Sequence, residues 1–145
     1  MSDNQQSQVA VWIRAKGAVL VVADAASARP GPDQIVVRNR AVAVNPLEWI
    51  IQVAGGLTYR WLRYPTVLGS DLAGEVVAVG SDVTRFQVGD RVLAHAVGTD
   101  KDTNNPVEGA FQQYTVVLER MAAPIPHNLP FTHAAVLPLA LSTAA

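Results

Sequence analysis

The sequence lacks cysteine altogether, and its 145 residues include only three histidines. Without cysteine there is no disulfide framework, no thiol nucleophile and no cysteine-based zinc site. His95, His127 and His133 lie apart from clustered carboxylates, so they make a poor tetrahedral ligand set. We therefore predict no bound metal. We expect His95 to be a hydrogen-bonded structural residue at a strand end, and the other two to be surface or helix-start residues.

Charge is also scarce, because charged residues make up 16% of the chain against a norm of roughly 25%. Eleven basic and twelve acidic residues give a formal charge of -1, which leaves no broad basic surface for nucleic acid or an anionic membrane. Residues 59–64 interleave aromatics with two arginines, too few for a nucleic-acid interface. The sequence also lacks an apolar run of membrane-spanning length. We predict no nucleic-acid partner and no membrane.

The first eight residues are polar and lack the basic and apolar regions of a signal peptide. We therefore expect residues 1–8 to be a flexible N-terminus and the protein to be cytoplasmic.

Half of the residues are hydrophobic, and valines cluster in short runs broken by glycine, proline and aspartate. This pattern is typical of a mainly β domain with few helices. Asn45-Pro46 marks a helix start that should run to Ala54 and stop at the following two glycines. Residues 98–109 form a polar segment that we expect to be an exposed loop. The expected strands are 9–14, 19–22, 34–44, 71–79, 91–94 and 111–117.

The last residues have a different character. Thr132 is placed to cap a helix over 133–145 that has almost no polar face and no C-terminal stop signal. A helix that is apolar on all sides is expected to be buried on all sides.

Five blocks in order resemble the medium-chain dehydrogenase/reductase superfamily, and they cover nearly the whole chain after residue 8. The blocks are residues 45–49 (NPLEW), 64–80 (YPTVLGSDLAGEVVAVG), 86–92 (FQVGDRV), 109–114 (GAFQQY) and 137–145 (LPLALSTAA). The branch they resemble is the zinc-independent one of fungal enoyl reductases and quinone-reductase-like enzymes. This resemblance implies a GroES-like, partly open β-barrel of the alcohol dehydrogenase N-terminal type over residues 9–131. It also implies that residues 132–145 begin the helix leading to a Rossmann domain.

The sequence contains no Gly-x-Gly-x-x-Gly motif of the kind that cradles a dinucleotide phosphate. We therefore expect this chain to be truncated, without the cofactor domain, and inactive alone. If the chain is not truncated, two alternatives remain open for the terminal helix: it packs within its own barrel, or it packs in a dimer interface. A stand-alone β-barrel interaction module is the alternative function. A chaperonin cap is less favoured, because residues 98–109 lack an apolar binding tip.

The resemblance implies reduction of an activated double bond or carbonyl in a small molecule (an enone, quinone or enoyl thioester), with NADPH as the cofactor and without zinc. A homodimer is possible in the full-length protein. The implied cofactor-binding residues are Asn45, Pro46, Leu47, Glu48 and Thr143. The implied substrate-binding residues are Leu137, Pro138, Leu139, Ala140, Leu141, Ser142, Thr143 and Ala144.

Other site residues keep alternative interpretations. Tyr59 and Tyr64 are candidate catalytic residues, and for Tyr59 a packing or lid aromatic is the favoured alternative. Asn45 could serve only as a helix cap. The resemblance implies an aspartate and a lysine near this turn, where this chain has Glu48 and Ile50, so the cation expected to contact the phosphate is missing. The resemblance implies that Asp71 replaces a residue that serves the metal in zinc-using relatives. In this chain we expect Asp71 to form hydrogen bonds within the barrel.

Overall fold

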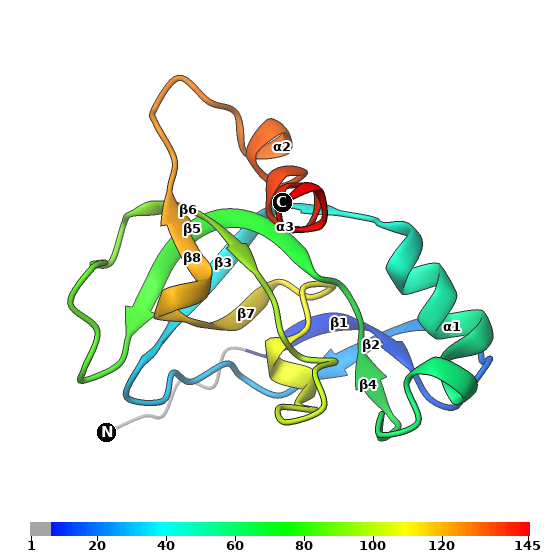
Figure 1. Cartoon of the computed structure of the whole chain (residues 1–145). Helices are drawn as coiled ribbons and strands as arrows, with labels where there is room; N and C mark the ends of the chain where they lie inside the picture. Colours follow the sequence, from blue (N-terminus) through cyan, green and yellow to red (C-terminus); the bar gives the residue numbers. More distant parts are fainter. Residues whose placement is uncertain (1–6) are drawn as a thin grey trace, which may run out of the picture.

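The computed structural model describes residues 7–145, in which eight strands form two antiparallel sheets and do not close into a single barrel (Figure 1). The first six residues of the predicted flexible N-terminus lie outside the described part of the chain. The smaller sheet has the order β2-β1-β4, with β1 at Gln8–Ile13, β2 at Leu20–Ala25 and β4 at Thr66–Val67. The fold is therefore mainly β, as the valine pattern predicted.

The larger sheet has five strands and contains the main core. Its order is β7-β3-β5-β6-β8, so the longest strands lie in the middle. Alternate side chains such as Ile35, Val37, Leu72 and Val92 point to one buried face, and Ala73 on the other face packs in a second buried cluster at the C-terminal segment. The bounds are β3 Gln34–Ala43, β5 Asp71–Val79, β6 Arg91–His95, β7 Tyr114–Leu118 and β8 Ala122–Pro124.

Strand β1 is joined to a segment far along the chain. The Val11 N–H donates to the Phe111 carbonyl at 2.8 Å, and the Tyr114 N–H donates to the side-chain oxygen of Gln8 at 2.8 Å. Gln8 is only 1% exposed. The first strand therefore begins one residue before its predicted start, and it links the two sheets.

Helix α1 (Pro46–Thr58) lies beside the three-stranded sheet (Figure 1). It packs through Ile51 in a cluster with Ile13, Leu62 and Leu68. The predicted stop after Ala54 is wrong, because the helix continues through Gly55 and the residue after it. Gly55 is buried where a β-carbon would lie 3.4 Å from the Tyr64 hydroxyl, so the glycine permits close packing and does not break the helix.

The C-terminal segment forms two short helices, and the predicted single helix is wrong. These are α2 (Phe131–Ala134) and α3 (Leu137–Ala144), which lie together at one end of the larger sheet (Figure 1). Pro138 explains the interruption, since its ring excludes the N–H and the space that a continuous helix would need. The residue before α2 is Pro130, so Thr132 lies inside the helix and does not cap it.

Burial in the C-terminal segment differs from the prediction. Ala134 and Ala135 are buried, but among the described residues of α3 none is buried. The segment 98–109 also differs, because only residues 100–102 are exposed, residues 103–107 are half-buried, and Gly98 and Glu108 near its ends are buried. A short 3-10 turn (η1, Pro106–Glu108) returns the chain to the core, and a second one (η2, Glu119–Met121) follows β7.

Candidate functional site

A groove of about 470 Å³ lies between the first turn of α1 and one side of α3. We call it the α1–α3 groove. It brings together segments that the resemblance assigned to ligand binding and that lie far apart in the sequence. Asn45 and Thr143 are its polar side chains, and the rest of the lining is apolar. The lining residues are Asn45, Pro46, Leu47, Ile50, Leu139, Ala140, Thr143 and Ala144.

The other predicted substrate residues lie elsewhere on α3. Pro138 and Ser142 face a second hollow of about 410 Å³, which they share with His95 and Arg120. Leu141 is 62% exposed, and Leu137 is half-buried at the start of the helix. One side of α3 therefore forms the groove wall, and the other side covers β6.

Glu48, which the resemblance assigned to the cofactor, has both carboxylate oxygens engaged within the chain. Its side chain is buried, and one oxygen accepts from the Asn45 N–H at 2.7 Å, which holds the start of α1. The other oxygen accepts from the Ser70 N–H at 3.0 Å. In this position Glu48 ties α1 to the beginning of β5, immediately behind the groove.

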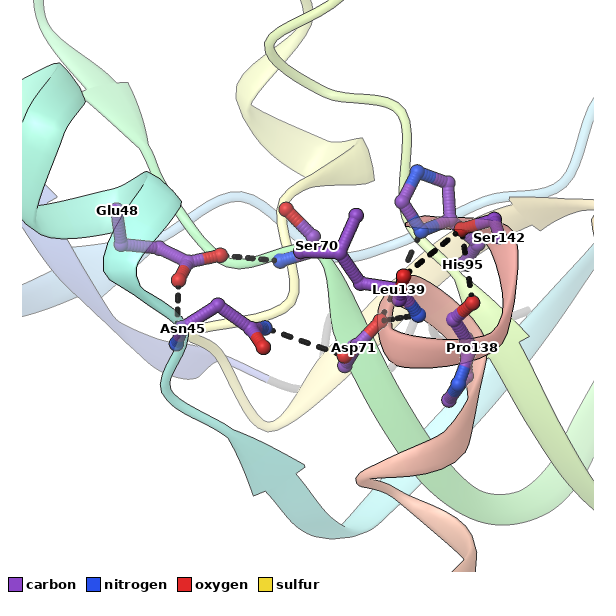
Figure 2. A network of polar contacts seen from close by, with 8 residues as sticks. All are labelled: Asn45, Glu48, Ser70, Asp71, His95, Pro138, Leu139 and Ser142. Carbon is purple, nitrogen blue, oxygen red and sulfur yellow. Dashed lines mark hydrogen bonds and ion pairs between the residues drawn. The ribbon is translucent and has the colours of Figure 1, made fainter. Parts of the chain in front are cut away.

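Asp71, the first residue of β5, is fully buried and lies between the two sides of the groove (Figure 2). Its Oδ2 accepts from Asn45 Nδ2 at 3.1 Å, and its Oδ1 accepts from the Leu139 N–H at 2.9 Å. The prediction that Asp71 hydrogen-bonds within the fold is confirmed.

His95, at the end of β6, is less well satisfied than the sequence predicted. Its Nδ1 lies 3.7 Å from the Asp71 Oδ1, too far for a hydrogen bond. This nitrogen is buried and has no hydrogen-bond partner in the described part of the chain. The prediction of a hydrogen-bonded His95 is therefore wrong for Nδ1. His127 and His133 are exposed, as predicted.

The two candidate catalytic tyrosines pack against α1, away from the groove lining. The Tyr59 ring lies 5.0 Å from the Trp61 ring, tilted by 50°. The Tyr64 hydroxyl is buried and has no hydrogen-bond partner among residues 7–145. Burial raises the pKa of both phenols, and Asp100 and Glu48 raise the pKa of Tyr59 further. Both phenols therefore stay protonated at neutral pH, and their catalytic role stays a prediction.

Two further observations concern metals and membranes. Within residues 7–145 we find no group of three or more histidine or acidic side chains placed to hold a metal ion. No helix in the same part of the chain has both the length and the apolar character needed to cross a membrane.

Sequence reasoning missed the link from Asp71 to α3, because its donor is the main-chain N–H of Leu139, which residue type does not reveal. It also missed an apolar hollow of about 460 Å³ beside β1 and β2. The repeated valines of these strands were the available signal. Val22 and Val44 on its lining are 69% and 79% exposed.

Residues 31–127 match the alcohol dehydrogenase GroES-like domain. The chain belongs to this family. The GroES-like domain places it in the medium-chain dehydrogenase/reductase superfamily, as the five blocks predicted.

Two curated fungal relatives and one solved structure are similar to this GroES-like domain. It is 56% identical to the dehydrogenase pigH of Monascus ruber, over 93% of this chain and 37% of the relative. It is 41% identical to lovC of Aspergillus terreus, the enoyl reductase component of lovastatin nonaketide synthase, over 99% of this chain and 35% of the relative. The quinone oxidoreductase of Coxiella burnetii has a TM-score of 0.81 at 25% identity, covering 93% of this chain and 42% of that one. The GroES-like domain thus spans less than half of each of these proteins.

Proposed function

We propose that this chain is the catalytic domain of a zinc-independent, NAD(P)H-dependent oxidoreductase that reduces an activated double bond or carbonyl. Its substrate would be an enone, a quinone or an enoyl thioester. One observation carries the proposal: Asn45, Leu47, Leu139 and Thr143, from two segments far apart in the sequence, line one groove. The similarity to an enoyl reductase component and to a quinone oxidoreductase supports this reaction class.

The composition of the groove fits part of a nicotinamide cofactor. A flat, largely apolar ring with an amide suits walls of Leu47, Ile50 and Leu139 with Asn45 at one edge. The lining carries no charged side chain among the described residues, so it does not suit the cofactor's phosphates. When bound, the reduced nicotinamide supplies a hydride.

The residues of this chain would bind the reactants and exclude water. The apolar walls lower the local dielectric, which strengthens any hydrogen bond made inside the groove. Thr143 brings a hydroxyl to the groove, where it can donate to an oxygen on which negative charge develops. Tyr59 and Tyr64 stay protonated, the state a proton donor requires, and they are the candidate proton donors although they lie outside the groove lining.

The test compares the 145-residue chain with a fusion in which a relative's nicotinamide-binding domain follows Ala145. We expect the chain alone to bind NADPH negligibly and to be inactive, because it has no glycine-rich phosphate loop. The fusion should oxidise NADPH, followed by its absorbance, when an enone is added.

The fusion also allows a matched pair of variants. Ala140→Trp fills the groove and should abolish turnover, whereas Leu141→Trp, one residue along on the exposed side, should leave it intact. Equal activity of the two variants would show that the groove takes no part in the reaction. A fusion that binds NADPH but reduces no enone, quinone or enoyl thioester would contradict the proposed activity.

A second candidate is an interaction module without catalysis, favoured by the exposure of Val136 and Leu141 at 53% and 62% in the C-terminal segment. A homodimer formed through this segment would be its simplest version. Sedimentation velocity of the 145-residue chain and of Leu141→Glu tests it, because such a dimer should dissociate in the variant. A monomeric wild-type chain would remove the homodimer.

A further inference from the structure

We propose that Asp71 is a positioning residue that fixes the separation of the two walls of the α1–α3 groove. The importance of Asp71 for catalysis rests on the proposed function, whereas its role in holding the two walls rests on hydrogen bonds that do not depend on that function. Both hydrogen-bond partners of Asp71 are groove residues: Asn45 lies on the α1 side and Leu139 on the α3 side (Figure 2). One carboxylate therefore spans from wall to wall.

Because Asp71 is buried, its carboxylate depends on the hydrogen bonds that connect it to the two walls. A fully buried carboxylate loses its hydration, so it needs hydrogen bonds from the protein. The two oxygens take one donor each from opposite walls, at 3.1 and 2.9 Å. His95 is a further neighbour at 3.7 Å and does not compete for either oxygen at hydrogen-bond distance.

The two walls depend on Asp71 to different degrees. On the α1 side, Asn45 is also held through its backbone N–H by Glu48, and α1 buries Ile51. On the α3 side, the helix lies against β5 and β6, but none of its described residues is buried. Because no described side chain of α3 is fully buried, the hydrogen bond from Leu139 to Asp71 should set the position of α3 beyond its attachment to α2, whose Ala134 is buried. Loss of Asp71 should chiefly displace the α3 wall.

The absence of cysteine allows a clean measurement of this separation. Val53 on α1 and Leu141 on α3 are 59% and 62% exposed, so Val53→Cys and Leu141→Cys introduce two spin labels at surface positions. Pulsed electron–electron double resonance on the 145-residue chain then gives the distribution of distances between the two spin labels, one on each helix. It requires neither cofactor nor substrate.

Three substitutions are placed in this labelled chain. Asp71→Leu removes both acceptors at similar volume. Asp71→Asn keeps an acceptor for the Leu139 N–H, and the Asn45 amide can turn to accept from the new NH₂ group. Thr66→Val is the control for losing a buried polar group, because Thr66 is fully buried outside the groove lining and its hydroxyl has no hydrogen-bond partner in residues 7–145.

We expect Asp71→Leu to shift or broaden the distribution by about 2 Å, the scale of helix displacements in packed proteins. Asp71→Asn and Thr66→Val should keep the wild-type distribution. A folded Asp71→Leu chain with the wild-type distribution would overturn the assignment, as would an equal shift in all three variants.

If Asp71→Leu fails to fold, Asp71→Ser replaces it, because a single short hydroxyl cannot accept from both Asn45 Nδ2 and the Leu139 N–H. This variant should also broaden the distribution, and an unchanged distribution would overturn the assignment. If the fusion described above proves inactive, these distances remain unaffected. The failure of the proposed function and the failure of the assignment are therefore distinguishable.

Discussion

Replacing Gly74 by alanine should destabilise the protein by about 2–3 kcal/mol. Gly74 lies in the middle of β5, opposite Asn39 on β3 and Val92 on β6. An added β-carbon would overlap the Arg38 carbonyl oxygen and lie 2.9 Å from Val37 Cγ1. The central strand pair would have to separate by roughly 1 Å to reach an ordinary C···O contact of ~3.3 Å.

The magnitude follows from the hydrogen bonds near this point. Weakening three or so ladder bonds at about 1 kcal/mol each loses roughly 3 kcal/mol. The alanine would return about 0.4–1 kcal/mol by restricting the unfolded chain. The net loss is a large part of the ~5–15 kcal/mol that holds a typical domain folded.

Urea unfolding followed by tryptophan fluorescence measures this loss. Gly17→Ala and Gly89→Ala are matched controls, because both positions have positive φ, +72° and +98°, and an added β-carbon meets nothing within 4 Å in the described chain. Each should lose about 1 kcal/mol through backbone strain alone. If Gly74→Ala loses no more than these controls, close strand approach is not what glycine provides at position 74.

Three further outcomes are expected from denaturation experiments. Burial raises the pKa of Glu108, so its contribution to stability is present below pH 4.5 and lost as the pH rises through the raised value; Glu108→Gln should remove this decline from the urea midpoint. Hydrogen bonds from Arg38 and Arg40 lower the pKa of Glu75, so its contribution is present above pH 4.5 and lost on acidification; Glu75→Gln should flatten that acid limb. Tyr64→Phe removes a buried hydroxyl without a partner in residues 7–145 and should raise the free energy of unfolding by about 0.5–1 kcal/mol; a lower value would mean that the hydroxyl is hydrogen-bonded in solution.

The longer strands were predictable because their signals are local, whereas β7 starts three residues after its predicted start and the short strands β4 and β8 were not predicted. Runs of valine bounded by glycine, proline and aspartate located β5 at its observed bounds and β3 to within one residue. The end of α1 was not predictable in this way, because Gly55 lies inside the helix at a buried position where an added β-carbon would meet the Tyr64 hydroxyl, a packing constraint that residue type does not reveal. The break between α2 and α3 did have a local signal in Pro138, which outweighs the apolar character of its neighbours.

The site was only partly predictable. The resemblance named the groove residues on both walls, although composition and periodicity could not bring Asn45 and Leu139 together. The buried position of Glu48 follows from the fold, which aims the Asn45 and Ser70 backbone amides at its carboxylate. Main-chain donors carry no sequence signal, so the engagement of Glu48 and Asp71 emerged only from the structure.

The contact between β1 and the segment after residue 110 also determines how late β1 can complete its pairing during folding. The Tyr114 to Gln8 hydrogen bond closes a span of 106 residues, and the loop-closure entropy of such a span is on the order of 4 kcal/mol. On the ribosome, at about 5–20 residues per second, β1 waits several seconds for this partner to be synthesised. The first strand to be made therefore completes its pairing late, and until then its apolar residues depend on β2, α1 and β4 for cover.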